Sequence, residues 1–264
     1  MKILISNDDG IMANGIRALV EALSVENDVY VVAPDRERSA AGHSLTLHTP
    51  IRVEELDPKY GAKRNWVTTG TPGDCVKIAL NAILAPEEKP EFVISGINHG
   101  PNLGTDILYS GTVSCALEGA MAGYRAIAVS LASLSAEPED FVTPAQVIAK
   151  LLPKIKEMDF PAKCILNINI PALEEDEIAG IAISTLGNKM FTDNYERRVD
   201  PRGKVYYWMA GELIKHDEND NSDLSAIRSN MISITPVTFE ITHKSVMKQL
   251  EDMLCSDDGT CSLE

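Results

Sequence analysis

Two carboxylates stand next to each other near the start of the chain, in the segment SNDDGIMANG at residues 6–15. Neighbouring side chains in a strand point to opposite faces, so Asp8 and Asp9 can address one point only if the strand ends near Asn7 and the chain turns, which Gly10 permits. Two clustered carboxylates repel each other, and a divalent cation removes that repulsion. Oxygen ligands of this kind suit Mg²⁺ or Mn²⁺, so the segment predicts a metal site. The alternative is a polar turn in which one aspartate caps the next helix.

Two later segments carry side chains of the kinds that bind phosphate. Residues 34–46 mix arginines with hydroxyls, and residues 95–119 are rich in glycine, amides and hydroxyls before a helix begins. Small residues let backbone N–H groups approach an anion, and the start of a helix favours negative charge. Each loop alone could be an ordinary connection, but long ordered loops are usually functional. A metal and a phosphate bound side by side would explain all three segments. The polar residues singled out in the two loops are Arg36, Arg38, Ser39, His43, Ser44, Ser95, Asn98, Asn102, Ser110 and Thr112.

The three segments can meet if each follows a strand of one parallel sheet, because ligands collect outside the carboxyl ends of such strands. Apolar runs with strand character alternate with segments of helical period, which predicts an α/β fold whose parallel sheet is covered on both faces. The expected strands are 2–7, 29–34, 65–70, 91–96, 126–132 and 164–170, and the expected helices are 15–24, 71–84, 112–122 and 144–158.

Composition limits the class of protein. The 264 residues suffice for one large domain or a core with an appendage, and a hydrophobic content of 44% argues against disorder. A net charge of −15 argues against nonspecific electrostatic binding of duplex nucleic acid over a large surface. No apolar run is long enough for a membrane span, and the N-terminus lacks the features of a signal peptide. The five cysteines are odd in number and lack metal-site spacing, so we expect a reduced, cytoplasmic protein.

The segment at residues 191–213 predicts a β-hairpin arm. Asp-Pro-Arg-Gly at 200–203 fits a type I turn, and residues 205–209 have strong strand preference. An isolated hairpin is marginal in water, so its aromatic rings need a surface to cover, either their own core or a second subunit. The aromatic residues of the segment are Phe191, Tyr195, Tyr206, Tyr207 and Trp208.

The rest of the C-terminal third is expected to be a solvated acidic loop at 212–223, a returning strand at 231–237 and a helix at 244–254. We therefore divide the chain into an α/β core at 1–185, a smaller part with the arm, returning strand and C-terminal helix at 186–254, and a flexible tail at 255–264.

Taken together, the motifs resemble those of the SurE family, the survival proteins that act as metal-dependent 5′/3′-nucleotidases. The matching stretches span nearly the whole chain, and their joint specificity is high. The resemblance implies a Rossmann-like α/β core with a smaller, arm-bearing C-terminal part. It also implies hydrolysis of nucleoside monophosphates to nucleoside and phosphate, with polyphosphate as a second substrate in some members. The stretches are ILISNDDGI (3–11), VVAPDRERSAAGHSLT (31–46), TGTPGDCV (69–76), SGINHGPNLGTDILYSGTV (95–113), LNINIP (166–171) and SITPV (233–237).

Carried over by motif, the resemblance makes Asp8, Asp9, Ser39 and Asn98 the ligands of one divalent cation per subunit, Mg²⁺ or Mn²⁺. Two carboxylates neutralise the ion, and neutral oxygens complete the shell with positions left for water and phosphate. We assign catalysis to Asp8, Asp9 and Asn98. The expected substrate-binding residues are Ser39, His43, Asn102, Ser110, Gly111 and Thr112.

In the expected mechanism the ion offsets charge on the phosphoryl group, and water oriented by Asp8 or Asp9 attacks in line. Asp8 as a covalent nucleophile is the competing route, and His43 is a candidate proton donor to the leaving group. The resemblance also implies a homodimer formed by arm exchange, with a homotetramer as a further assembly.

The sequence departs from the motifs of two other classes of protein. A receiver-like signalling domain would need an aspartate at the end of the third strand, where this chain has Thr-Thr-Gly. A haloacid-dehalogenase-type phosphatase would need Asp-x-Asp after the first strand, where this chain has Asp-Asp-Gly. A non-catalytic nucleotide-binding module stays open as the alternative function.

Overall fold

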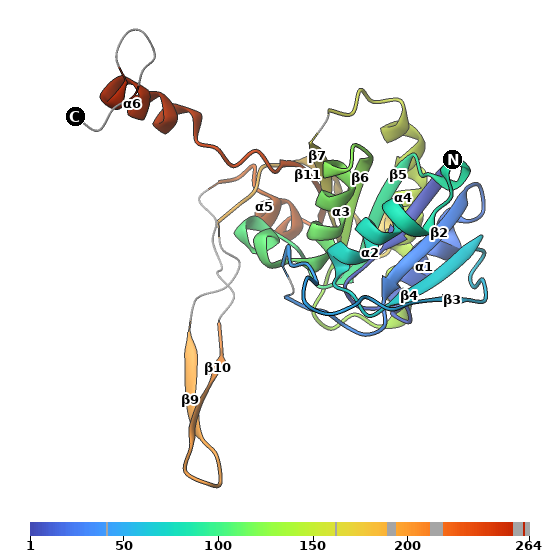
Figure 1. The fold of residues 1–264 in the computed structure, drawn as a ribbon, viewed down its shortest axis with the longest axis horizontal. Coiled ribbons are helices and arrows are strands. Elements are labelled where there is room, and N and C mark those ends of the chain that lie inside the picture. The colour runs from blue at the N-terminus through green and yellow to red at the C-terminus, as the bar shows by residue number, and fades with distance from the viewer. Residues whose placement is uncertain (41, 162, 189–193, 212–218, 256–260, 262–264) are drawn as a thin grey trace.

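A nine-stranded sheet forms the centre of the computed structural model (Figure 1), which describes all residues except 41, 162, 189–193, 212–218, 256–260 and 262–264. The strand order is β3-β4-β2-β1-β5-β6-β7-β11-β8. The pairs β3–β4 and β7–β11 are antiparallel, and the other neighbours run parallel. The expected α/β fold with a parallel core is therefore confirmed.

The strands of this sheet are β1 (Lys2–Ser6), β2 (Asp28–Pro34), β3 (Val53–Leu56), β4 (Arg64–Thr68), β5 (Phe92–His99), β6 (Arg125–Ala132), β7 (Cys164–Pro171), β8 (Gly180–Ile183) and β11 (Met231–Thr238). The α-helices are α1 (Asn14–Leu23), α2 (Pro72–Ile78), α3 (Gly111–Met121), α4 (Val142–Lys156), α5 (Asp223–Arg228) and α6 (Lys244–Leu254). Shorter helical turns are η1 (Ala79–Ile83), η2 (Pro86–Glu88), η3 (Gly104–Tyr109), η4 (Pro138–Phe141) and η5 (Glu175–Glu177).

The helices cover both faces of the sheet because each has one apolar side. The side of α1 that carries Ile16, Leu19, Val20 and Leu23 is buried and packs with α4 in one hydrophobic cluster. Helices α2 and α3 pack together in a second cluster on the other face. The predicted helix at 71–84 is divided, since α2 ends at Ile78 and a π-helical turn follows. Elements β3, β8 and α5 are too short for a clear sequence period and were not predicted from the sequence.

The order of the strands places a crevice at the carboxyl end of β1. From β1 the chain builds the sheet outward through β2 and β4, then crosses back to β5 on the other side of β1 and continues outward through β6 and β7. In open parallel sheets this switch in direction is where ligands bind. Asp8 and Asp9 follow β1, and Asn98 lies at the end of β5, so the two strands that flank the switch point carry the candidate metal ligands.

The predicted arm is present as a two-stranded antiparallel sheet of β9 (Tyr195–Val199) and β10 (Val205–Met209), which stands away from the main sheet (Figure 1). The predicted turn is confirmed, because Gly203 N donates to Asp200 O at 3.0 Å. The side chains of both strands are exposed. Phe191, expected to belong to the arm, lies outside the described residues.

The acidic run at 212–223 differs from the predicted solvated loop in its last two residues, which are buried, whereas residues 219–221 are exposed as predicted. Asp223 is fully buried and begins α5, because Ser222 caps that helix by accepting the Ser225 N–H. Residues 212–218 lie outside the described part of the chain. The returning strand β11, which we grouped with the arm in 186–254, pairs between β7 and β8 in the main sheet. The division at residue 185 stays a prediction.

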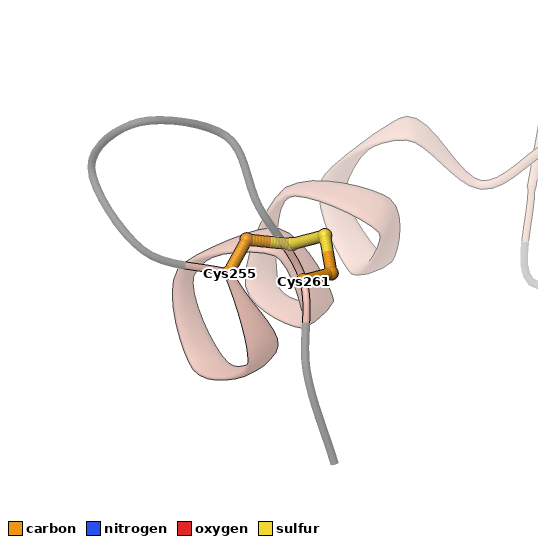
Figure 2. The surroundings of a disulfide bond; sticks show 2 residues. All are labelled: Cys255 and Cys261. Carbon is orange, nitrogen blue, oxygen red and sulfur yellow. A yellow bond between two sulfur atoms is a disulfide. The ribbon is translucent and has the colours of Figure 1, made fainter. Parts of the chain in front are cut away.

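The C-terminal helix α6 has no buried side chain and stands clear of the main sheet (Figure 1). Beyond it, Cys255 and Cys261 form a disulfide (Figure 2). The expectation of fully reduced cysteines is wrong for this pair, whereas Cys75, Cys115 and Cys164 are free thiols. No helix in the described part of the chain is long and apolar enough to cross a membrane.

Candidate active site

The turn after β1 presents both acids to the sheet edge. The buried Asn7 side chain stabilises this turn with two hydrogen bonds: its amide donates to Gly10 O at 2.9 Å, and its Oδ1 accepts the Gly10 N–H at 3.2 Å. Gly10 has φ of +99°, a conformation that a side chain would strain. The strand therefore ends at Ser6 and the chain turns at Gly10, as the sequence predicted.

The start of helix α3 lies directly against Asp8. A Cβ at Gly111 would lie 2.6 Å from the Asp8 Cβ, so only glycine allows this approach. The Thr112 hydroxyl donates to Asp8 Oδ1 and lies 3.2 Å from Asn98 Oδ1. Ser110 caps the helix by accepting the Val113 N–H at 3.0 Å. Because N–H groups at a helix start favour anions, the carboxylate pair and an anion-binding helix end occupy one place.

Asn98 joins Asp8 because β5 has an irregular end. The register between β5 and β6 shifts between Ser95 and Asn98, which turns Asn98 toward the site. Its Nδ2 donates to Gly100 O at 2.7 Å, so its Oδ1 faces Thr112. The neighbouring His99 donates its backbone N–H to Asp9 Oδ2 at 3.1 Å. The structure thus gathers five predicted site residues: Asp8, Asp9, Asn98, Gly111 and Thr112.

Burial disfavours the charged forms of both acids, and repulsion by Asp8 adds to this effect at Asp9. Burial raises the pKa of Asp8, opposed by hydrogen bonds from Thr112 and Gly111. Burial and the charge of Asp8 raise the pKa of Asp9 to about 7, opposed by the His99 N–H. An uncompensated carboxylate pair with an amide oxygen beside it is the donor set that a hard divalent cation requires. The residues present therefore fit such an ion.

Ser39 lies in the loop after β2, and that loop is fastened to the same turn. The Arg38 N–H donates to Asp8 O at 2.7 Å, and the Arg38 guanidinium donates to Thr69 O at 2.9 Å. The Ser39 hydroxyl is exposed and donates to Glu37 Oε1 at 2.5 Å. In the described residues its hydroxyl has no hydrogen bond to Asp8, Asp9 or Asn98, so its role as a metal ligand stays a prediction.

Asn102 is held inside the protein. Its amide donates to Ser130 Oγ at 2.8 Å, and its backbone N–H donates to Asn169 Oδ1 at 2.8 Å. Its carbonyl accepts from both Asn167 and Asn169 at 2.9 Å. In this structure its side chain anchors the loop to β6 and β7. Direct contact between Asn102 and substrate stays a prediction.

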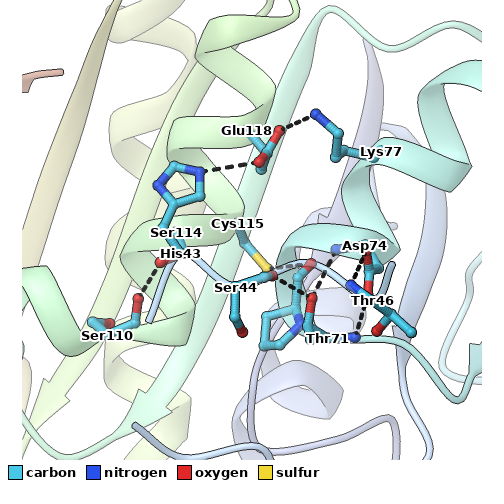
Figure 3. A network of polar contacts seen from close by, with 11 residues as sticks. His43, Ser44, Thr46, Thr71, Asp74, Lys77, Ser110, Ser114, Cys115 and Glu118 are labelled. Atoms are coloured by element: carbon cyan, nitrogen blue, oxygen red, sulfur yellow. Dashed lines mark hydrogen bonds and ion pairs between the residues drawn. The ribbon is translucent and has the colours of Figure 1, made fainter. Parts of the chain in front are cut away.

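His43 contacts α3 at Glu118, farther from the start of that helix than the point where Asp8 contacts it. Its Nε2 lies 3.0 Å from Glu118 Oε1, and Lys77 Nζ lies 3.0 Å from Glu118 Oε2 (Figure 3). Burial would raise the pKa of Glu118, but the hydrogen bonds from His43 and Lys77 outweigh it and hold that pKa below its ordinary value. Glu118 follows Gly111 by seven residues, or about two helical turns. His43 therefore fastens the loop at 42–46 to α2 and α3 in this structure, and proton donation by it stays a prediction.

Four polar contributors to the site were not predicted from the sequence. Glu37 adds negative charge that raises the pKa of Asp9, and His99 supplies its backbone N–H to the same acid. Asn167 and Asn169 alternate on β7, and both point to Asn102. Their signal was available: buried asparagines in a strand need partners, and the LNINIP motif places two of them on one face.

Comparison with known proteins agrees with this geometry over most of the chain. Residues 3–193 match the family model described as survival protein SurE. The chain belongs to the SurE family. Asp8, Asp9, Ser39 and Asn98, which the sequence motifs singled out, all lie inside the matched range.

Relatives of this SurE chain match it over nearly its whole length. A protein of Thermosynechococcus vestitus named 5′-nucleotidase SurE is 48% identical over 260 residues, which cover 96% of this chain and 97% of that protein. A protein of Pelotomaculum thermopropionicum with the same name is 49% identical over 256 residues, covering 96% and 95%. The crystal structure of the SurE protein from Aquifex aeolicus has a TM-score of 0.83 at 38% identity and covers 95% of this chain and 98% of that one. The SurE fold is therefore shared by almost the entire chain.

The raised pKa of Asp9 predicts how the metal-free SurE chain responds to pH. Unfolded, Asp9 has its ordinary pKa of 3.8, and folded it has a pKa of about 7. The folded state binds the extra proton between those values, so this contribution to stability falls as pH rises from about 4 to about 7.

Asp9→Asn removes the charge and should raise the Tm of the metal-free protein by a few degrees at pH 8, with no gain near pH 4. Calorimetry in chelator at both pH values checks this. A lower Tm at pH 8 would instead assign Asp9 a structural role in the turn, through the His99 N–H that it accepts.

Proposed function

We propose that this protein is a metal-dependent phosphomonoesterase that hydrolyses nucleoside 5′- and 3′-monophosphates to nucleoside and phosphate. The observation that carries the proposal is the meeting of Asp8 and Asp9 with the start of α3 at Gly111 and Thr112. Cation ligands and anion-binding N–H groups rarely share so small a space without a ligand that needs both. A phosphate bound through a cation has that chemistry. Relatives matching the chain from end to end carry the name 5′-nucleotidase, which supports the same reaction.

Asp8, Asp9, Ser39 and Asn98 would hold one divalent cation, with Mg²⁺ or Mn²⁺ as the candidates. When bound, the ion supplies positive charge that stabilises a phosphoryl group in hydrolysis. For Ser39 to join this set, its hydroxyl must leave Glu37, to which it donates in the present structure. The loop needs no large rebuilding for this, since Arg38 already fixes it to Asp8.

Phosphate binding and orientation of the attacking water are the work of groups in and around the Asp8–Asp9 pair. Ser110, Gly111 and Thr112 hold phosphate oxygens at the start of α3, where the helix favours negative charge. Asp9 accepts only the His99 N–H among the hydrogen bonds of its carboxylate to described residues, which leaves lone pairs to orient the attacking water. Asp8, held by Thr112 and packed against Gly111, is the more constrained of the two. Water attack is therefore favoured over a covalent step on Asp8.

The non-catalytic alternatives lack comparable support. A receiver-like domain or a plain nucleotide-binding module does not explain a full-length match to proteins named as nucleotidases. Trimming of polyphosphate is a further activity of the same site, because its terminal group presents the same dianionic phosphate to the pair.

The test of this proposal is a panel of 5′- and 3′-nucleoside monophosphates, ribose 5-phosphate and polyphosphate, assayed with chelator, Mg²⁺ or Mn²⁺. We expect release of phosphate from nucleotides only when a divalent ion is present, and recovery when the ion is restored. Full turnover by a metal-stripped protein, or no turnover of any nucleotide, overturns the proposal.

We further infer a homodimer formed by exchange of the arm. In the β9–β10 register, residues directly opposite each other share a face. One face is therefore apolar apart from a single arginine: Tyr195, Arg197, Val199, Val205, Tyr207 and Met209. These side chains are exposed, and an apolar hairpin face of this kind is stable in water when a second surface covers it. Charge supports a second copy, since the hairpin at residues 195–209 carries four basic and two acidic residues in a chain of net charge −15. A homotetramer would contain two such arm-exchanged dimers.

A further inference from the structure

The fully buried carboxylate of Asp223 joins three segments that are distant in sequence. Its Oδ2 accepts the Gly104 N–H at 2.9 Å. Its Oδ1 accepts the Gly187 N–H at 2.9 Å and the Leu224 N–H at 2.9 Å. Gly104 belongs to the loop that leads to the site, Gly187 to the segment that leads to the arm, and Leu224 to α5.

Near this carboxylate, the chain that leads to the arm contacts the chain that returns from it. We call these two segments, residues 185–188 and 222–223, the root of the arm. The outgoing chain at Thr185 pairs with Ser222 of the returning chain, and Asp223 N donates to Thr185 O at 2.9 Å. Gly104 packs tightly on the same root, because a Cβ there would lie 1.9 Å from Asn188 O. Both ends of the arm-bearing segment are therefore fastened to Gly104, and Asp223 is at the centre of the contact.

Gly104 is linked to the phosphate end of the site by a short, firmly packed element. It begins the 3₁₀ helix η3 (Gly104–Tyr109), which runs directly into Ser110, the cap of α3. Leu103 and Ile107 are buried on either side of this start, and the Ser110 N–H donates to Ile107 O at 3.2 Å. A shift of Gly104 is thus carried to Gly111 and Thr112, which touch Asp8.

We propose that Asp223 is a positioning residue for the hydrolysis proposed above, holding the start of α3 at the distance from Asp8 and Asn98 that the phosphate requires, and tying that distance to the root of the arm. The inference rests on the proposed function. A carboxylate is suited to the task because both of its oxygens accept, so it serves donors on both sides at once. An asparagine of the same shape offers one oxygen and one NH₂ group, and the NH₂ would face a backbone N–H of either Gly104 or Gly187. Only one of the two segments would remain fastened.

The decisive experiment is the kinetics of Asp223→Asn with a nucleoside monophosphate and Mn²⁺, at a temperature well below the Tm of the variant. We expect KM to rise about tenfold, since small misplacements of positioning groups have effects of this order. Inorganic phosphate, as product inhibitor, should lose affinity by a similar factor. The dissociation constant of Mn²⁺ in the absence of phosphate, measured by calorimetry, should stay within about twofold, because Asp8 and Asp9 lie on another element. A residue needed only for folding would lower the active fraction, and hence the apparent kcat, and leave KM unchanged.

Glu88→Gln is the matched control. Glu88 is also a carboxylate that accepts a backbone N–H, from Ala85 at 2.9 Å, and it pairs with Arg64 near the amino end of β5, at the opposite edge of the sheet. Its loss should lower Tm and leave KM unchanged. Gly104→Ala tests the same contact from its other side, since the new methyl group must push Asn188 away with Asp223 intact. It should reproduce the rise in KM, and it decides the question if Asp223→Asn does not fold.

The outcomes separate the two proposals. A wild-type protein that hydrolyses no nucleotide overturns the proposed function. A wild-type enzyme that is active, with KM unchanged in Asp223→Asn, or in Gly104→Ala where that variant decides, overturns the positioning role alone.

Discussion

Replacing Asp8 by asparagine should lower kcat by roughly two or more orders of magnitude, because charge stabilisation by a catalytic metal is worth several kcal/mol and each 1.4 kcal/mol is about tenfold in rate. The amide keeps an acceptor for the Thr112 hydroxyl, so the start of α3 should stay in place. The lost element is one negative charge of the pair. Asp9→Asn should have a comparable effect for the same reason. Steady-state kinetics over a range of Mn²⁺ concentrations measures kcat at saturating metal.

The matched control for this change is Asp28→Asn. Asp28 is a half-exposed aspartate at the amino end of β2, where it pairs with Lys63 at 3.2 Å. Removing its charge changes the net charge of the protein by the same amount at the opposite edge of the sheet, and kcat should stay within about twofold, as expected of an exposed pair. If Asp8→Asn keeps wild-type kcat while still binding Mn²⁺, the carboxylate pair is not the catalytic centre. That result would favour the alternative that Asp8 and Asp9 only form a polar turn.

Replacement of residues 193–210 by a short Gly-Ser linker should convert a dimer into a monomer. The linker removes β9 and β10 with their exposed apolar face and leaves the site residues in place, since Asp8, Asp9 and Ser39 lie in loops of the main sheet and Asn98 lies at the end of β5. Light scattering at several protein concentrations measures the assembly, and Mn²⁺ binding shows that the metal site survives.

Leu47→Ser provides the control for the arm, because Leu47 is an exposed apolar side chain outside it. That variant should keep the oligomeric state of the wild type. A linker variant that remains dimeric with an unchanged dissociation constant would remove the arm from the dimer contact and leave its aromatic rings without the role proposed here.

Local pattern alone determined the alternation of strands and helices, the turn at Gly10 and the hairpin at 200–203. These features depend on short-range causes: apolar period, the φ that glycine permits, and the fixed φ of proline in a turn. The two acids and the glycine-rich loop at 95–119 were also visible as candidates, because polar side chains after an apolar strand have few structural reasons to cluster.

Tertiary structure decided which candidates meet. The switch in strand order puts β5 beside β1, so Asn98 and Thr112 reach Asp8 across about 100 residues of sequence, and no local pattern encodes that pairing. It also separated residues that the sequence had grouped: His43 turns to Glu118, and Asn102 turns inward to the asparagines of β7. The acidic run at 212–223 shows the same limit most clearly. Its charge predicted solvent, but Asp223 is buried because backbone N–H groups from Gly104 and Gly187 converge on it, and donors supplied by distant segments cannot be counted from the sequence around the acid.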